Sequence, residues 1–466
     1  LLIVLVCVDR NYLFIMDRSL RNVMLLGLAF MLVFTAFQTM SNIQQTITDS
    51  IVKDDPTYDG DAYYSQAIIY GFFSLFNWSA PSVVSIIGPK FSMFLGGTVY
   101  VAFILQFLAP KAWGMYLCSA LLGIGAAMIW TGQGNYLTLN STKKYITRNS
   151  GIFWALLQLS MFVGNTFVFF AFKGKTEVDK STRTFVIITL AAVGAVGLIV
   201  LFVLPKAFKE EEDEEEEVEE AKPQGPVEAF LGSVRLFFTM RMFLLNFAFL
   251  YTGLELGFFS AIYSSCLGFT KNFENRKELV GISGIFMGLG EVLGGGIFGI
   301  FGHKTVKWGR DPVVSTGFLL HILAFVLIFL NLPNNSPFAD TDDSAIITSN
   351  AILAIFCSFL LGLGDSIYNT QIFSLLGTVY ADNSAPAFAI FKFSQSLGAV
   401  ITFVSAKSLG LHYQLAILLV MSVLGTLCFI KVEWYAKKKA ALLSSRKERE
   451  ERRSVDRSRM RQIEDF

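Results

Sequence analysis

Apolar residues gather in twelve long runs along the chain, and short polar segments separate them. Each run is close to the roughly 20 residues that an α-helix needs to span a bilayer. Hydrocarbon offers no water to backbone N–H and C=O groups, so we expect helices rather than strands. The predicted spans cover residues 22–46, 63–87, 91–109, 113–137, 150–172, 184–204, 241–266, 279–301, 313–332, 349–379, 385–408 and 412–434.

An acidic segment divides the runs into two sets of six. Ten of the eleven residues from Glu210 to Glu220 are Asp or Glu, and Pro223, Gly225 and Pro226 follow them. Such a segment repels itself and has no apolar surface to bury, so it is expected to be a solvated connector. A docking segment for a basic partner is the alternative.

The two sets share short sequence matches that keep each helix six positions away from its counterpart. The matched segments are 34–38 with 251–255, 88–90 with 302–304, and 122–125 with 361–364. Internal repeats of this kind are typical of the six-plus-six major facilitator organisation, in which the binding cavity lies between the halves near the bilayer midplane.

We therefore predict an all-α membrane protein with twelve transmembrane helices in two six-helix halves. The first eight residues are apolar but too few to span a bilayer, and they are assigned to a tail. The predicted parts are an N-terminal tail (1–21), a first half (22–204), an acidic cytoplasmic linker (205–240), a second half (241–435) and a basic C-terminal tail (436–466).

Composition agrees with a membrane protein. Of the 466 residues, 53% are hydrophobic and 46 are Phe, while the net charge of +1 sums an acidic linker and a basic tail. The five Cys are scattered without metal-ligand spacing, so neither a disulfide framework nor a metal site is expected. We expect no cofactor and no nucleic-acid partner.

The distribution of basic residues favours tails on the cytoplasmic side. The segment from Lys437 to Arg461 holds eleven Lys or Arg, whereas the short loops barely decide the orientation. This tail is expected to be solvated, and binding to anionic lipid or to the acidic linker are alternatives. On this topology Asn334 is a glycosylation candidate on the outer side, and the sequon at Asn140 is cytoplasmic.

Four ionisable residues fall inside predicted spans of the second half: Glu255, Glu291, Asp365 and Lys392. A charge at the bilayer centre costs about 2.5 to 3.5 kcal/mol on insertion scales, so each is a functional candidate. The first half offers amides instead, with Gln38, Asn42 and Gln45 on one face of its first helix. Two helical spacings add further neighbours, Asn369 beside Asp365 and Gln395 beside Lys392.

We expect Lys392 to pair with Asp365 or Glu255 and to leave at least one buried acid without a cation. Burial favours the neutral form of a carboxyl, so such an acid is suited to proton coupling. The alternative is that these groups pair only to lock helices together, and this applies most to Glu291 because glycines surround it.

No motif of a soluble enzyme is evident. The Gly288–Gly302 segment is rich in glycine but lies within a span, which indicates close helix packing or a hinge rather than a nucleotide loop. His303, His321 and His412 are expected to stand at span ends or alone. We therefore expect neither catalytic residues nor an enzyme.

Five stretches resemble the uncoordinated-93-like branch of the major facilitator superfamily. They are FTAFQT from Phe34, RNSGIFWALLQ from Arg148, YTGLELGFFS from Tyr251, GLGDSIYNTQ from Gly362 and SAPAFAIFKF from Ser384. The resemblance covers residues from about 20 to 435 and implies a twelve-helix multi-pass protein. It also implies one of two activities: relatives regulate potassium channels or escort endosomal receptors, while this branch is classed with transporters.

One departure from the superfamily pattern favours the regulatory or trafficking activity over transport. The usual loop between helices 2 and 3 carries glycine, aspartate and basic residues, whereas this chain has Gly88, Pro89 and Lys90. Between helices 8 and 9, Lys304, Lys307 and Arg310 come before Asp311.

The sequence favours a solute transporter that works by alternating access and is coupled to protons. Its expected midplane cavity is lined by Gln38, Asn42, Glu255, Glu291, Asp365, Asn369, Lys392 and Gln395. The alternative is a regulatory or trafficking partner of a channel or receptor in the bilayer. The plasma membrane and the endomembranes remain equal possibilities.

Overall fold

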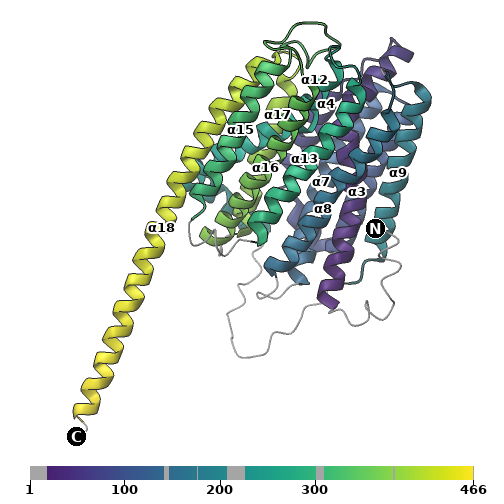
Figure 1. The fold of residues 1–466 in the computed structure, drawn as a ribbon. Coiled ribbons are helices and arrows are strands. Elements are labelled where there is room, and N and C mark those ends of the chain that lie inside the picture. Colours follow the sequence, from purple (N-terminus) through teal and green to yellow (C-terminus); the bar gives the residue numbers. More distant parts are fainter. Residues whose placement is uncertain are drawn as a thin grey trace.

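The computed structural model describes residues 18–140, 146–175, 177–206, 226–300, 309–380 and 384–464. These residues form a bundle of α-helices from which one helix projects (Figure 1). The acidic run, residues 302–304 of the repeat and most of the N-terminal tail lie outside the described residues.

The helices follow the predicted order. The first half contains α3 (Arg18–Asp54), α4 (Ala62–Phe76), α5 (Ala80–Ile87), α6 (Pro89–Leu105), α7 (Ala112–Leu139), α8 (Ile146–Phe172) and α9 (Lys180–Val203). The second contains α10 (Pro226–Phe237), α11 (Met240–Gly257), α12 (Tyr263–Phe269), α13 (Arg276–Ile300), α15 (Asp311–Asn331), α16 (Ala351–Val379), α17 (Ser384–Ser405) and α18 (Leu411–Glu464). Eleven helical segments of the described chain are long and apolar enough to cross a bilayer.

The predicted span 63–87 is wrong as a single helix. Its residues form α4 and α5, which are interrupted at Asn77–Ser79. The cause is Pro81, which has no N–H to bond to the carbonyl of Asn77 four residues earlier.

Two segments outside the predicted spans are also helical. The predicted linker 205–240 contains α10, whose apolar and polar residues alternate with helical period. At the other end of the chain, α18 continues past the membrane span as a single helix of 54 residues. The C-terminal tail is therefore helical as far as Glu464.

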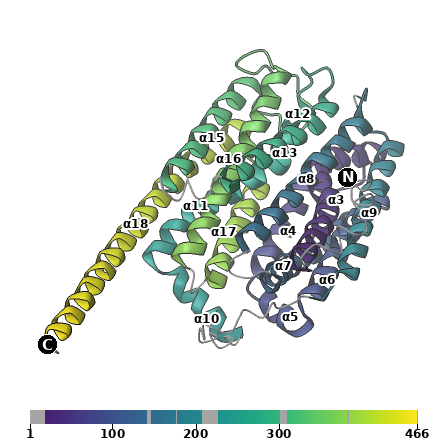
Figure 2. The same ribbon diagram turned by 60° about the horizontal axis from the view of Figure 1, so that its bottom comes forward.

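The bundle has two ends, which we name by their contents. The tail face is the end where α3 begins and from which α18 projects, and α10 lies there too (Figures 1 and 2). The loop face is the opposite end, with residues 55–61 after α3 and residues 332–350 before α16.

The two halves pack their helices in the same way. In the first half α3 packs on α8 and α9, α4 on α7, and α6 on α7 and α9. In the second half α11 packs on α17 and α18, α13 on α16, and α15 on α16 and α18. The matched glycines 123 and 362 serve the same purpose, because a Cβ on either would overlap a carbonyl oxygen of the facing helix. Each half also has its own hydrophobic core.

The halves meet along two helix pairs, α4 with α17 and α8 with α13. We call this interface the seam. It runs through the bundle between the first half and the second, as Figure 2 shows. Groups that line the seam are the ones a relative movement of the halves would separate.

Candidate functional site

Five acidic, histidine or lysine side chains of the described second half lie deep in the bundle. Four are near the middle of their helices, and the fifth, Glu255, lies near the end of α11 and near the middle of the longer span Met240–Phe269. The five are Glu255 on α11, Glu291 on α13, His321 on α15, Asp365 on α16 and Lys392 on α17. The three acids and the histidine are buried, and Lys392 is partly exposed. Because five different helices supply one residue each, the site depends on the packing of the whole half.

Glu255 is the most isolated of these groups. It is 1% exposed, and neither of its carboxyl oxygens has a hydrogen-bond partner among the described residues. The nearest polar groups are the carboxyl of Asp365 and the Nε2 of His321, which is 3.6 Å from Oε1. A π-helical turn, Phe258–Ile262, follows directly after α11. Such turns occur frequently at functional sites.

His321 does not stand alone as expected. Its Nε2 lies 3.1 Å from the Leu361 carbonyl oxygen, and its Nδ1 shares a hydrogen bond with the Tyr251 hydroxyl. The signal was present in the sequence, since residue 321 is at the centre of the predicted span 313–332. Despite these neighbours, the described residues contain no three His, Cys, Asp or Glu placed to hold a metal ion.

A chain of amides connects Asp365 to Lys392. Asn369 donates to Asp365 Oδ1 at 2.7 Å, and Gln395 donates to Asn369 Oδ1 at 3.2 Å. The ammonium of Lys392 donates to Gln395 Oε1 at 2.9 Å. The expected direct ion pair of Lys392 with Asp365 or Glu255 is therefore not formed, because two amides lie between the charges. The four residues Asp365, Asn369, Gln395 and Lys392 are called the amide chain below.

Glu291 lies at the seam. Its carboxyl contacts Gln158 of α8, in the first half, and its backbone carbonyl accepts a hydrogen bond from Ser366 at 2.8 Å. These contacts are the helix-locking kind that the sequence left open as an alternative for this residue.

The amides of α3 divide between two roles. Gln38 accepts a hydrogen bond from Ser160 within its own half. Asn42 donates to Asn165 Oδ1 at 2.7 Å and accepts from Ser264 of α12, so it connects the halves. The predicted cavity residues thus occupy two levels of the seam rather than one.

Aromatic rings line the tail side of the seam. Trp154 of α8 stacks on Trp130, with ring centroids 5.8 Å apart, and meets Phe373 of α16 edge to face at 5.8 Å. The ammonium of Lys392 lies over the Phe373 and Phe391 rings, 5.7 and 4.9 Å from their centroids. The sequence analysis missed this aromatic layer.

Two cavities open elsewhere, near the loop face. One, of about 460 Å³, is lined by Asp55, Tyr58, Asp59, Lys111 and Trp113 among others. The second, of about 440 Å³, lies between Tyr64, Tyr116 and Val404. Neither is lined by the residues predicted for the midplane cavity.

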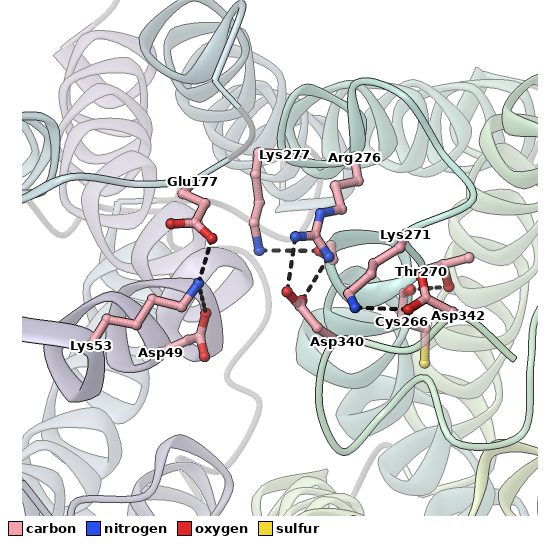
Figure 3. A network of polar contacts seen from close by, with 11 residues as sticks. Asp49, Lys53, Glu177, Cys266, Thr270, Lys271, Arg276, Lys277, Asp340 and Asp342 are labelled. Atoms are coloured by element: carbon pink, nitrogen blue, oxygen red, sulfur yellow. Dashed lines mark hydrogen bonds and ion pairs between the residues drawn. The ribbon is translucent and has the colours of Figure 1, made fainter. Parts of the chain in front are cut away.

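A cluster of charges closes the loop end of the seam (Figure 3). In the first half, Lys53 pairs with Glu177 at 3.0 Å, and in the second, Arg276 pairs with Asp340 at 2.7 Å. The buried ammonium of Lys277 donates to the Gly268 carbonyl at 3.1 Å, near both groups. Sequence reasoning treated these residues as loop charges, because it cannot show which span ends meet.

A second loop-face contact pairs Lys407, after α17, with Asp61, which caps α4. Partial burial opposes the charge on Lys407, but the hydrogen bond and charge of Asp61 raise its pKa above the ordinary value. The two residues hold α4 and α17 together at this face.

The two sequons differ in their surroundings. Asn140, near the tail face, is buried and donates to the Tyr136 carbonyl. On the loop face, the side-chain oxygen of Asn334 accepts from the His412 N–H at 3.0 Å, and Ser336 of the same sequon is buried. Glycosylation of Asn334 stays a prediction.

Comparisons of the sequence point to one family. The profile of the ion channel regulatory protein UNC-93 matches residues 55–430. UNC93-like protein MFSD11 of Xenopus tropicalis is 46% identical over 433 residues, which cover 90% of this chain and 97% of that protein. UNC93-like protein 3 of Arabidopsis thaliana is 26% identical, over 86% of this chain and 83% of that protein.

Comparisons of the structure point to one fold. The nucleoside transporter NupG is similar with a TM-score of 0.59 and 14% identity, covering 88% of this chain and 99% of that one. The peptide transporter POT is similar with a TM-score of 0.62 and 13% identity, covering 89% and 94%. At such identities the likeness concerns the arrangement of helices.

Proposed function

Because this chain belongs to the UNC-93 family and has the major facilitator fold, we propose that it transports a small solute by alternating access. The observation that carries the proposal is the amide chain, which joins an acid to a cation at mid-depth of the bundle. Polar groups at this depth are costly in a membrane protein and mark pathways for solutes or ions.

The seam suits a rocking movement. On its loop side the Tyr63 hydroxyl donates to the Pro337 carbonyl at 2.9 Å, and on its tail side Trp154 contacts Phe373. Both contacts join one half to the other. A solute therefore reaches the amide chain when one of these two sets of contacts separates, and it leaves when the other does.

Coupling to protons is proposed for the neighbouring acids Glu255 and Asp365. Two carboxylates side by side in a poorly solvated site repel each other, so one of them is stabilised by holding a proton. When the seam opens, water reaches Asp365, and the repulsion between its carboxylate and that of Glu255 is weakened. In this scheme Asp365 exchanges the proton, and Glu255 keeps the pair from ionising fully.

We propose that both tails are cytoplasmic. The basic segment 437–461 supports this orientation, because positive residues near span ends are retained on the cytoplasmic side. Protease protection of a tag after residue 466, together with glycan mapping, tests it. Sugar on Asn140 would reverse the orientation.

The first experiment is a thermal-shift screen of the purified chain against small solutes at pH 5.5 and 7.5. A solute at 100 times its dissociation constant stabilises a protein by about 2.7 kcal/mol. We expect a pH-dependent hit whose pH dependence is lost in Asp365→Asn while the variant stays folded. Unchanged pH dependence in that variant would rule out the coupling role.

The structure adds one observation in favour of the regulatory alternative, the helical tail that α18 extends beyond the bundle. Such a tail gives a channel or receptor a surface to bind. Absence of any solute hit, together with a membrane protein that co-purifies with the whole chain but not after deletion of residues 446–466, would favour this alternative.

A further inference from the structure

Lys392 is the mid-depth ionisable side chain that a solute in the seam would meet first. Of the five such residues in the described chain, the other four are at most 9% exposed, whereas Lys392 is partly exposed. The acidic side chains of this region are thus buried between helices, whereas the positively charged Lys392 is accessible at the helix surface.

The ammonium of Lys392 has unused donors. It has three N–H groups and one described hydrogen bond, to Gln395, with no carboxylate within 4.0 Å in the described chain. The amide chain holds Asp365 away from it. A partly buried ammonium without an anion has lost part of its hydration, so an incoming anionic group gains a charge-assisted hydrogen bond here.

The surroundings of this ammonium are flat and apolar. Phe373 lies beneath it and is packed against Phe388, at 5.1 Å between centroids, and against Trp154 of the opposite half. Rings of α16 and α17 therefore flank the cation, and a ring of the first half packs against one of them. A ligand that fits carries an anionic group on a planar apolar body.

We propose that Lys392 binds the carboxylate of the transported solute and that the solute is an aromatic or similarly apolar organic acid. This inference rests on the proposed transport function and deepens it. It predicts selection by charge: acids are accepted, while amines of the same shape meet the ammonium and are rejected.

The test uses matched probes on the purified full-length chain. Indole-3-propionate, its primary amide and the corresponding amine share one ring system and differ in charge. Binding is measured by calorimetry for the unaltered chain, Lys392→Gln, Lys392→Arg and the control Lys431→Gln, which removes an exposed lysine of α18. We expect the acid to bind best, at least tenfold weaker binding in Lys392→Gln, partial rescue by Lys392→Arg and no change in the control.

Other outcomes separate the two proposals. Preferential binding of the amine overturns the inference and leaves transport standing. Acid binding that is unchanged in Lys392→Gln also overturns it. Absence of binding by all three probes overturns the inference, and the broad solute screen then decides on transport. Should Lys392→Gln fail to fold, protection of Lys392 from reductive methylation by the acid, read by mass spectrometry of the unaltered chain, replaces it.

Discussion

The two halves of this molecule share one helix packing and differ in what they bury. In the first half, the partly buried amide of Gln38 accepts a hydrogen bond from Ser160. In the second half, the matched position holds Glu255, whose carboxyl has no hydrogen-bond partner in the described chain. The repeat thus supplies the scaffold twice but keeps acids in one copy. Two halves that share one fold can therefore contribute unequally to a binding site between them.

Each half also has an arginine ion pair, and the acid in the two pairs is buried to different degrees. Arg183 of the first half pairs with Asp54 at the loop face, at 2.8 Å. Arg310 of the second half pairs with Glu433 at the tail face, also at 2.8 Å. The difference is in burial, because the Asp54 side chain is 45% exposed and that of Glu433 is 3% exposed.

The largest predicted effect tests this difference. Arg310→Ala leaves the carboxylate of Glu433 buried and unpaired, which typically costs about 3 to 5 kcal/mol. Arg183→Ala is expected to cost less, since water solvates Asp54. Thermal unfolding in one detergent at one pH measures both. Equal losses would show that burial of the partner does not control these pairs.

A second prediction concerns close packing within the second half. A Cβ on Gly253 would overlap the backbone oxygen of Gln395, so Gly253→Ala pushes α11 away from α17. We expect a destabilisation of about 1 to 3 kcal/mol. Gly134→Ala is the control, since a Cβ there has no atom of the described residues within 4 Å outside its own stretch of helix. A loss in the control as large as in Gly253→Ala would contradict the packing explanation.

The third prediction concerns a variant in which the two halves carry the same residue type at the matched positions 38 and 255. Glu255→Gln replaces a carboxyl by the amide found at the matched position, and it removes the neighbour that constrains Asp365. The thermal stability of this variant is expected to vary less between pH 5 and 8 than that of the unaltered chain. Gln38→Glu, the reverse change, is expected to lose about 1 kcal/mol, because the single Ser160 hydroxyl does not fully replace water around a partly buried carboxylate. A neutral Gln38→Glu variant would remove the contrast.

The smallest effect is predicted for the contact between the halves at the loop face. The Lys407 side chain is 47% exposed, so Lys407→Ala is expected to cost less than about 1 kcal/mol. Its effect should instead appear as faster maleimide labelling of a cysteine introduced at the buried Ala67 of α4, because α4 and α17 are released. Labelling at the same rate would show that this pair does not hold the seam. Since the pKa of Lys407 is raised, the pair contributes fully below the ordinary lysine pKa and is lost as pH rises through the raised value.

Sequence reasoning predicted the fold and the family well, and both are confirmed. Long apolar runs separated by polar loops predict transmembrane helices, because a helix satisfies its backbone hydrogen bonds internally in a bilayer. The break at Asn77–Ser79 was missed because the span was predicted from its apolar residues alone. Pro81, which cannot donate a backbone hydrogen bond, indicated the break.

The sequence predicted the residues of the site but not the hydrogen bonds between them. Insertion cost singles out Glu255, Asp365 and Lys392 from sequence alone. That two amides separate Lys392 from Asp365 depends on how α16 and α17 are rotated about their axes within the bundle. Close contacts set these rotations, such as that of Gly253 on α11 with Gln395 on α17. The aromatic layer was missed for a similar reason, since Trp154 and Phe373 meet across the seam and neither lies near the other in sequence.

The last helix projects far beyond the bundle and is continuous with a membrane span of the second half. From Lys438, where its membrane segment ends, α18 continues to Glu464, about 40 Å at 1.5 Å per residue. Because span and extension are one continuous helix, each degree by which the second half tilts displaces the tip by about 0.7 Å, on the 1.5 Å rise. The tip therefore amplifies motions too small to detect at mid-depth. A dye near residue 464 would convert the working cycle of a single molecule into a fluorescence trace.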